Sequence, residues 1–194
     1  MDSKQKLSLS YRLLRLVGLN YSEEQYGNVS LHRIAIQFFA NIYHALLLSM
    51  MNWVILEPVN PRLLRPFLLR RLGCNVGKGV FIGDHVIVDM NHAELVTIDD
   101  FAHITGGCRL LCHQRDLSKY HAGDNAAKLG YKYAPIRIGK GCMVGMESMI
   151  MPGVTIGDGA IIGAGSLVTK DIPAWTVATG RPAKVVKQIP ERKQ

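Results

Sequence analysis

A branched aliphatic residue recurs at every sixth position over much of this chain. The unbroken run is Ile138, Val144, Ile150, Ile156, Ile162 and Val168. A helix repeats near 3.6 residues and a simple strand near 2, so neither explains a period of six. The period is typical of short strands joined by tight turns, in which three hexads form one triangular turn of about 18 residues.

The repeat begins earlier and is interrupted twice. The first block is Val76, Ile82 and Val88, and after a slip of four residues it resumes as Ile98, Ile104 and Leu110. The hexads then stop, and they return only at Ile138. An interruption as long as residues 111–137 is expected to form a functional arm that leaves the coil at that point.

The repeat also predicts a core and two ends. Cys108 and Cys142 fall on the small inward position of their hexads, so we expect buried thiols and neither a disulfide nor a zinc framework. Glycines after the aliphatic residues suit corners where a side chain would clash or where φ is positive. The ends of such a stack need caps. The general crossover rule favours a right-handed coil.

Three segments carry a resemblance: VGKGVFIGDHVIVDMN, ELVTIDD, and the long run from APIRIG through IGAGSLVTKDIP to GRPAKVV. They resemble the hexapeptide-repeat acyltransferases, in the branch that acetylates sugar hydroxyls. The resemblance implies a mainly β fold, a left-handed parallel β-helix with an N-terminal helical extension, assembled as a homotrimer. This coil is the known exception to the crossover rule. It implies acetyl-CoA as donor, no metal, and an active site between subunits. The expected division is an extension over 1–71 and an acyltransferase coil over 72–189 with a protruding loop at 114–135.

His113 is the candidate catalytic base. It stands where the hexads stop, which is the position of the catalytic histidine in the resembled family. Transfer to a hydroxyl needs a base that works near neutral pH, and histidine meets that need. The alternative is an exposed loop histidine. Cys112, its neighbour, is a weaker candidate as a nucleophile.

The resemblance also implies acceptor-binding residues in the segment VDMN, because Asp89 and Asn91 match positions where related sugar acetyltransferases hold polar acceptor-binding residues. Asp89 either orients the histidine, binds a sugar hydroxyl, or bonds only its own backbone at a corner. His92, in the slip, is expected to edge the acceptor pocket. Among the other histidines, His121 lies in the arm, and His85 and His103 are expected on the surface.

The donor site follows from the resemblance, residue by residue. Met146 and Ala164 are implied to contact the coenzyme through their main chain, and Thr169 and Lys170 form a further contact pair. The basic residues implied near its phosphates are Lys184 and Lys187. A methionine at position 146 replaces a commoner small residue of the family.

The N-terminal part contains a run, Ile34 to Leu56, without Asp, Glu, Lys or Arg. Its length is enough to span a bilayer. Four of its polar residues would share one stripe of a helix, an arc of roughly 80°: Gln37, Asn41, His44 and Asn52. The sequence leaves three readings open, namely a helix on the membrane surface, a helix packed in the trimer, or a true span. An earlier segment, Leu7 to Leu19, is also basic and apolar. The helix expected over Ile34 to Leu56 is then broken by Pro58, Pro61 and Pro66.

The formal net charge of +8 has three readings: solubility, attraction to anionic lipid, and attraction to the phosphates of coenzyme A. Nucleic acid is not an expected partner, because the basic residues show no binding motif. Free thiols and the absence of a secretory signal favour a cytoplasmic protein. If the N-terminal helix lies on the membrane surface, the protein is expected to be peripheral on the inner face of the cell membrane.

The predicted activity is transfer of an acetyl group from acetyl-CoA to a hydroxyl of a sugar or glycan, lipid-linked or polymeric, by direct transfer with His113 as general base. Two other classes stay open. One is a γ-type carbonic anhydrase-like zinc trimer, to which His113 and His121 would contribute. The other is a non-catalytic β-helix scaffold.

Overall fold

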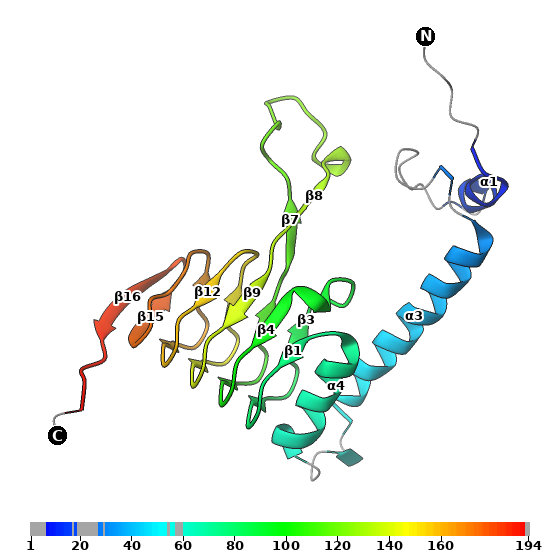
Figure 1. Ribbon diagram of the computed structural model, residues 1–194. Coiled ribbons are helices and arrows are strands. Elements are labelled where there is room, and N and C mark those ends of the chain that lie inside the picture. The colour runs from blue at the N-terminus through cyan, green and yellow to red at the C-terminus, as the bar shows by residue number, and fades with distance from the viewer. Residues whose placement is uncertain are drawn as a thin grey trace. The chain divides into compact units, whose positions relative to one another are not determined.

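The computed structural model describes residues 7–16, 18, 27–28, 30–53, 55–56 and 60–192 (Figure 1). The chain divides into two compact units, residues 1–44 and 45–194. The second unit contains the hexads and every candidate site residue. It also takes in residues 45–71, which precede the first hexad.

Helices dominate the described residues of the first unit. Helix α1 spans Leu9–Leu16, and helix α3 spans Leu31–Met50 and runs on into the second unit. Within α3 the Gln37 amide donates a 2.9 Å hydrogen bond to Asn41 Oδ1, so part of the predicted polar stripe forms. Large apolar side chains of α3 are exposed in this unit: Leu31, Ile36, Phe38, Phe39, Ile42 and Tyr43.

The apolar run does not form one helix as far as Leu56. Helix α3 ends at Met50, so the prediction that Asn52 extends the helical stripe is wrong. Asn52 lies in the following turn, where its Oδ1 accepts a 2.7 Å hydrogen bond from the backbone N–H of His85. Leu19, Val54 and Pro58 lie outside the described residues. Among the helices that are described, none has the length and apolar character to cross a membrane.

The second unit is a parallel β-helix with very short strands (Figure 1). In the described residues the coil has three sheets, one on each side. The first sheet contains β1 (Asn75–Val76), β4 (Val96–Ile98), β9 (Ile136–Ile138) and β12 (Thr155–Ile156). The second contains β2 (Phe81–Ile82), β5 (His103–Ile104), β10 (Met143–Val144), β13 (Ile161–Ile162), β15 (Thr176–Gly180) and the antiparallel β16 (Ala183–Gln188). The third contains β3 (Ile87–Val88), β6 (Arg109–Leu110), β11 (Met149–Ile150) and β14 (Leu167–Val168).

The aliphatic residues of the hexads form the core as predicted. On the third sheet, each residue pairs with the next in strict register, and none is more than 2% exposed: Val88, Leu110, Ile150 and Val168. The other two sheets carry equivalent ladders. The small positions are also inward, and Cys108 and Cys142 are fully buried. The prediction of a mainly β coil with a period of six is confirmed.

Where a glycine follows the aliphatic residue of a hexad, it allows the close approach of successive turns. A Cβ on Gly145 would lie 2.5 Å from the backbone nitrogen of Ala164. Positive φ falls two residues further along the hexad, as at Gly141, where φ is 65°. The two reasons for glycine that the sequence suggested therefore apply to two different positions.

We predict that Gly145→Ala destabilises the coil. The added methyl meets backbone, which cannot rotate away, so the expected loss is about 1–3 kcal/mol of unfolding free energy. Gly130→Ala is the matched control, because a Cβ there meets nothing within 4 Å. Urea unfolding followed by circular dichroism measures both. Equal stability of the two variants would contradict the close packing of the turns.

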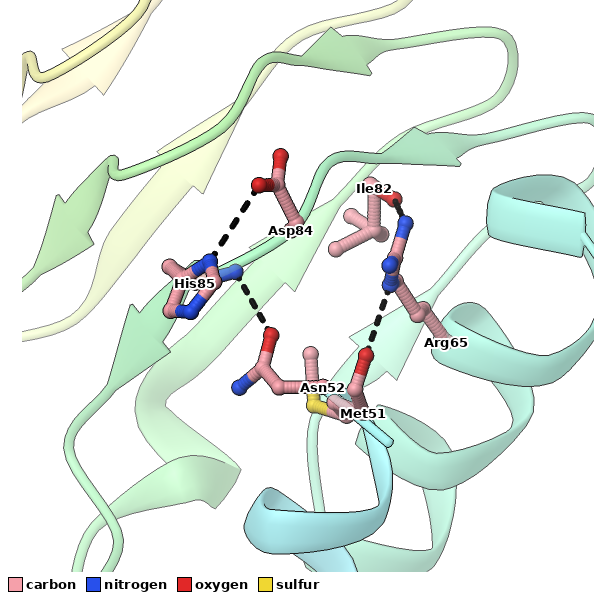
Figure 2. A network of polar contacts seen from close by, with 6 residues as sticks. All are labelled: Met51, Asn52, Arg65, Ile82, Asp84 and His85. Carbon is pink, nitrogen blue, oxygen red and sulfur yellow. Dashed lines mark hydrogen bonds and ion pairs between the residues drawn. The ribbon is translucent and has the colours of Figure 1, made fainter. Parts of the chain in front are cut away.

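A helical cap closes the first turn of the coil. It consists of the π-helical turn η2 (Asn60–Leu64) and helix α4 (Arg65–Leu72). Arg65 is 5% exposed, and Figure 2 shows its guanidinium reaching two carbonyls. Nε donates to Met51 O at 2.9 Å, and Nη1 donates to Ile82 O at 3.4 Å. A cation at the end of α3 also suits the helix dipole. These bonds join the helices to strand β2 and meet the requirement for a cap.

Both interruptions of the repeat leave the coil at the same corner. The slip follows β3 and contains the 3₁₀ turn η3 (Ala93–Leu95). The arm follows β6, the next strand of the same sheet, and returns to β9 (Figure 1). It contains the two-stranded ribbon β7 (His113–Arg115) and β8 (Tyr131–Tyr133), with the 3₁₀ turn η4 (Ala126–Lys128) between them. Two insertions on adjacent turns at one corner must lie beside each other.

Candidate functional site

The corner after the third sheet brings Asp89 to His113. The backbone N–H of Asp89 donates to Leu110 O at 3.2 Å, which continues the ladder one residue beyond β3. His113 follows Leu110 by three residues and begins the arm. The residues are 24 apart in sequence, and their side chains form a short hydrogen bond between His113 Nδ1 and Asp89 Oδ2.

This contact sets the chemistry of the imidazole. The Asp89 side chain is 5% exposed and the His113 side chain 41% exposed, so the carboxylate is held in the protein while the ring reaches solvent. An ionised carboxylate only accepts hydrogen bonds. The neutral ring therefore carries its proton on Nδ1 and presents a lone pair on Nε2. Of the three readings of Asp89, the geometry matches the one in which it orients the histidine.

A pocket of ≈ 190 Å³ opens beside this pair. It is lined by Asp89, Asn91, His92, His113, Tyr131 and Tyr133. Aromatic rings dominate it: the His92 and Tyr133 centroids are 4.2 Å apart, and Tyr131 meets the His113 ring edge-on at 5.3 Å. Asn91 adds an amide that can donate and accept. The pocket can hold a small group with both hydroxyl and apolar faces.

The structure thus gathers His113, Asp89, Asn91 and His92, as the sequence indicated. It places the other histidines elsewhere. The His121 side chain is 82% exposed in the arm, with its Nδ1 3.7 Å from Asp124. His85 is exposed, whereas His103 is half-buried against Phe81, with ring centroids 4.0 Å apart. Burial lowers the pKa of His103, with a further contribution from the nearby positive charge of Arg62.

The candidate donor residues lie on the surface in three places. Met146 and Ala164 occupy the corner between the second and third sheets, where Gly165 N–H donates to Met146 O at 2.7 Å. Thr169 and Lys170 follow β14, at the corner that His113 also uses but two turns further along. The remaining pair, Lys184 and Lys187, is exposed on β16. None of the six lines the His113 pocket.

Burial makes the cysteine thiols poor nucleophiles. It raises the pKa of Cys112 to about 11, with a further contribution from Asp89, and that of Cys74 to about 12. A nucleophilic role for Cys112 therefore has no support. In the part of the chain that is described, no three or more His, Cys, Asp or Glu side chains are grouped to hold a metal.

We predict that native Cys112 resists alkylation. With a pKa near 11, about one thiol in a thousand is ionised at pH 8, and the residue is fully buried. Iodoacetamide at pH 8, followed by mass spectrometry, should leave Cys112 unmodified in the native protein and modify it in urea. Rapid labelling of the native protein would show a reactive thiol beside the pocket.

Sequence reasoning missed the two tyrosines of the pocket. The signal was present in YKYAPIR, where aromatic residues alternate as in a strand just before the coil resumes. Alternation places Tyr131 and Tyr133 on one face of β8. Which face of β8 points toward His113 depends on how β8 pairs with β7. The sequence does not reveal that pairing, because the ribbon contains no hexads.

Comparisons with known proteins agree with this architecture. The family model "Bacterial transferase hexapeptide (six repeats)" matches residues 135–170. The putative colanic acid biosynthesis acetyltransferase WcaF of Escherichia coli K12 is 33% identical over 137 residues, covering 64% of this chain and 74% of the relative. The galactoside O-acetyltransferase of the same organism is 38% identical over 119 residues, covering 60% of this chain and 57% of the relative.

A solved structure extends the likeness. The maltose O-acetyltransferase from Clostridium difficile 630 superposes with a TM-score of 0.56 at 26% identity, covering 80% of this chain and 89% of that one. The alignments span little more than half of the galactoside enzyme and 35% of a putative acetyltransferase of Staphylococcus aureus. The family model and the alignment with WcaF show that the chain belongs to the bacterial hexapeptide-repeat transferases.

Proposed function

We propose that this protein is an O-acetyltransferase that moves an acetyl group from acetyl-CoA to a hydroxyl of a sugar or glycan. The observation that carries the proposal is the imidazole of His113, held by a buried carboxylate at the mouth of a small aromatic pocket. The reaction class is supported by the names of the relatives, which are a galactoside O-acetyltransferase, a maltose O-acetyltransferase and a putative acetyltransferase of colanic acid biosynthesis.

In the proposed mechanism, Nε2 of His113 takes the proton of the acceptor hydroxyl as its oxygen attacks the thioester carbonyl. Asp89 stabilises the imidazolium that forms and keeps the ring oriented. Collapse of the tetrahedral intermediate breaks the C–S bond. The imidazolium then returns its proton to the leaving thiolate. No covalent acyl-enzyme is required.

The pocket suits a sugar as acceptor. A pyranose has apolar C–H faces and hydroxyl edges, and the rings of His92 and Tyr133 lie beside the amide of Asn91. Rings offer flat surfaces of low conformational entropy, while the amide supplies direction. We therefore assign Asn91 to acceptor binding and Asp89 to positioning of the base.

For the donor, we propose that the exposed main chain at Met146 and Ala164 and the side chains of Thr169 and Lys170 contact the coenzyme. Lys184 and Lys187 then meet its phosphates, because ammonium groups form charge-assisted hydrogen bonds with phosphate oxygens. Since these residues occupy more than one corner and none lines the His113 pocket, we propose a homotrimer in which neighbouring subunits complete the donor site.

We expect His113→Ala to lower kcat by about 10²–10⁴-fold, the usual contribution of a general base. Asp89→Asn should lower kcat by at least about tenfold, because an amide can also hold the opposite tautomer. Initial rates with acetyl-CoA and a galactoside or maltose test both. The KM for acetyl-CoA and the trimer mass from light scattering should stay the same.

His121→Ala is the matched control, since that histidine lies in the same arm and is more exposed. Its kcat should stay within about twofold of the parent, because it lies outside the pocket. Near-normal turnover of His113→Ala would overturn the mechanism. A loss of trimer in that variant would instead assign His113 to assembly.

We also propose that α3 holds the protein on the cytoplasmic face of a membrane. Phe38 and Phe39 are 59% and 67% exposed on this helix. A soluble surface rarely shows as large a group of neighbouring apolar side chains as the exposed ones of α3. Arg12 and Arg15 lie on α1, and the chain carries a net charge of +8. Apolar burial combined with basic charge is the pattern of helices that lie at anionic lipid interfaces.

The double substitution Phe38→Glu and Phe39→Glu should abolish cosedimentation with vesicles of anionic phospholipid, because buried apolar area is lost and like charge is added. Leu117→Glu, at a 62% exposed site in the arm, is the control. Binding by the parent should weaken as salt rises. A parent protein that ignores the vesicles at low salt would exclude the membrane role and favour a helix packed against protein.

A further inference from the structure

One face of the arm continues the pocket away from the coil. The ribbon pairs His113 with Tyr133, Gln114 with Lys132, and Arg115 with Tyr131. Directly opposed residues of an antiparallel pair share a face, and the face alternates along each strand. His113, Tyr133, Tyr131 and Arg115 therefore share one face, and Gln114 and Lys132 share the other.

Arg115 is fixed on this face by two contacts. Its guanidinium carbon lies 4.2 Å from the centroid of the Tyr131 ring, and Nη1 donates to Leu129 O. The first is a cation–π contact. The Tyr131 ring in turn meets His113 edge-on. The order along the ribbon is thus base, aromatic ring, cation.

Within the described part of the chain, the Arg115 charge has no acidic partner. Across the described residues, no carboxylate forms an ion pair with it. The nearest acid in sequence, Asp116, accepts from the Ser118 backbone N–H at 3.0 Å. Leu129 takes one N–H group of Arg115, and the residue is exposed, so further N–H groups of its planar fork are available to a ligand. That fork matches the oxygens of a carboxylate or a phosphate.

We propose that Tyr131 and Arg115 form a second acceptor subsite that selects a saccharide with an anionic group on the unit beside the one acetylated. This inference rests on the proposed acetyl transfer. Two residues along a strand put the Cα atoms of His113 and Arg115 about 7 Å apart, so the cation lies beside the sugar unit next to the one acetylated. Tyr131 packs against the intervening ring, and Arg115 pairs with the charge.

The test compares three disaccharides that differ only in the group at C6 of the non-reducing unit: cellobiose, cellobiouronic acid, and cellobiose phosphorylated at that position. The measured quantity is kcat/KM for acetylation by the full-length protein. The parent should prefer an anionic disaccharide over cellobiose by about tenfold or more, the strength of a partly exposed charge-assisted bond. Whichever anion is preferred identifies carboxylate or phosphate as the natural group.

Arg115→Gln should remove that preference, and Arg115→Lys should restore part of it. Lys132→Gln is the matched control, because it removes the same charge from the same ribbon on the opposite face and should keep the preference. Equal loss in Arg115→Gln and Lys132→Gln would show general electrostatic attraction and overturn the subsite. The subsite would also be overturned if Arg115→Gln changed only the KM for acetyl-CoA, because that result would assign Arg115 to the donor site.

Binding without donor separates this inference from the proposed reaction. Saturation-transfer NMR of the same disaccharides needs no chemistry. If none is acetylated while anionic binding still depends on Arg115, acetyl transfer to these sugars fails and the subsite stands. If all are acetylated with equal efficiency, the reaction stands and the subsite is wrong. Absence of both binding and acetylation overturns the subsite as well.

Discussion

In-register stacking of the turns is the constraint on which the site depends. Each turn bonds to the next through parallel pairs such as Val88–Leu110 and Leu110–Ile150, whose side chains fill a closed core. A single extra residue within a strand would turn its inward side chain outward. Extra residues therefore leave the coil at corners. The slip and the arm both leave at the corner after the third sheet, on adjacent turns, and this brings Asp89 within reach of His113.

The site combines a rigid part and an extended part. Asp89 continues a buried ladder, so its carboxylate is held by the coil and cannot easily follow a moving ligand. His113 begins the ribbon, where the backbone turns away from the core. A base positioned by a buried partner and open on its other side needs little reorganisation during proton transfer. The ribbon beyond it adds the tyrosines and Arg115, which we propose extend the surface available to an acceptor.

Much of this arrangement could be predicted from the sequence, because the hexads repeat and the arm does not. The period of six gave the ladders, the inward position of Cys108 and Cys142, and the two interruptions. Asp89 and Asn91 were expected at the acceptor site from the family resemblance, and His92 was expected at its edge from its place in the slip. The orientation of Asp89 stayed open among three readings, since an aspartate at a corner can also bond its own backbone. Tyr131, Tyr133 and Arg115 were missed because the register of a lone ribbon depends on tertiary contacts. The end of α3 at Met50 was also missed, because capping by Arg65 joins residues distant in sequence.

The most direct test of the account is the tautomer of His113. Nitrogen-15 NMR of histidine-labelled protein, assigned with the His113→Ala variant, distinguishes a ring protonated on Nδ1 from one protonated on Nε2. The pairing with Asp89 predicts a neutral ring with its proton on Nδ1, and a shift toward the other tautomer in Asp89→Asn. A His113 ring with its proton on Nε2 in the parent protein would contradict the account, because that nitrogen could not then accept the proton of a hydroxyl.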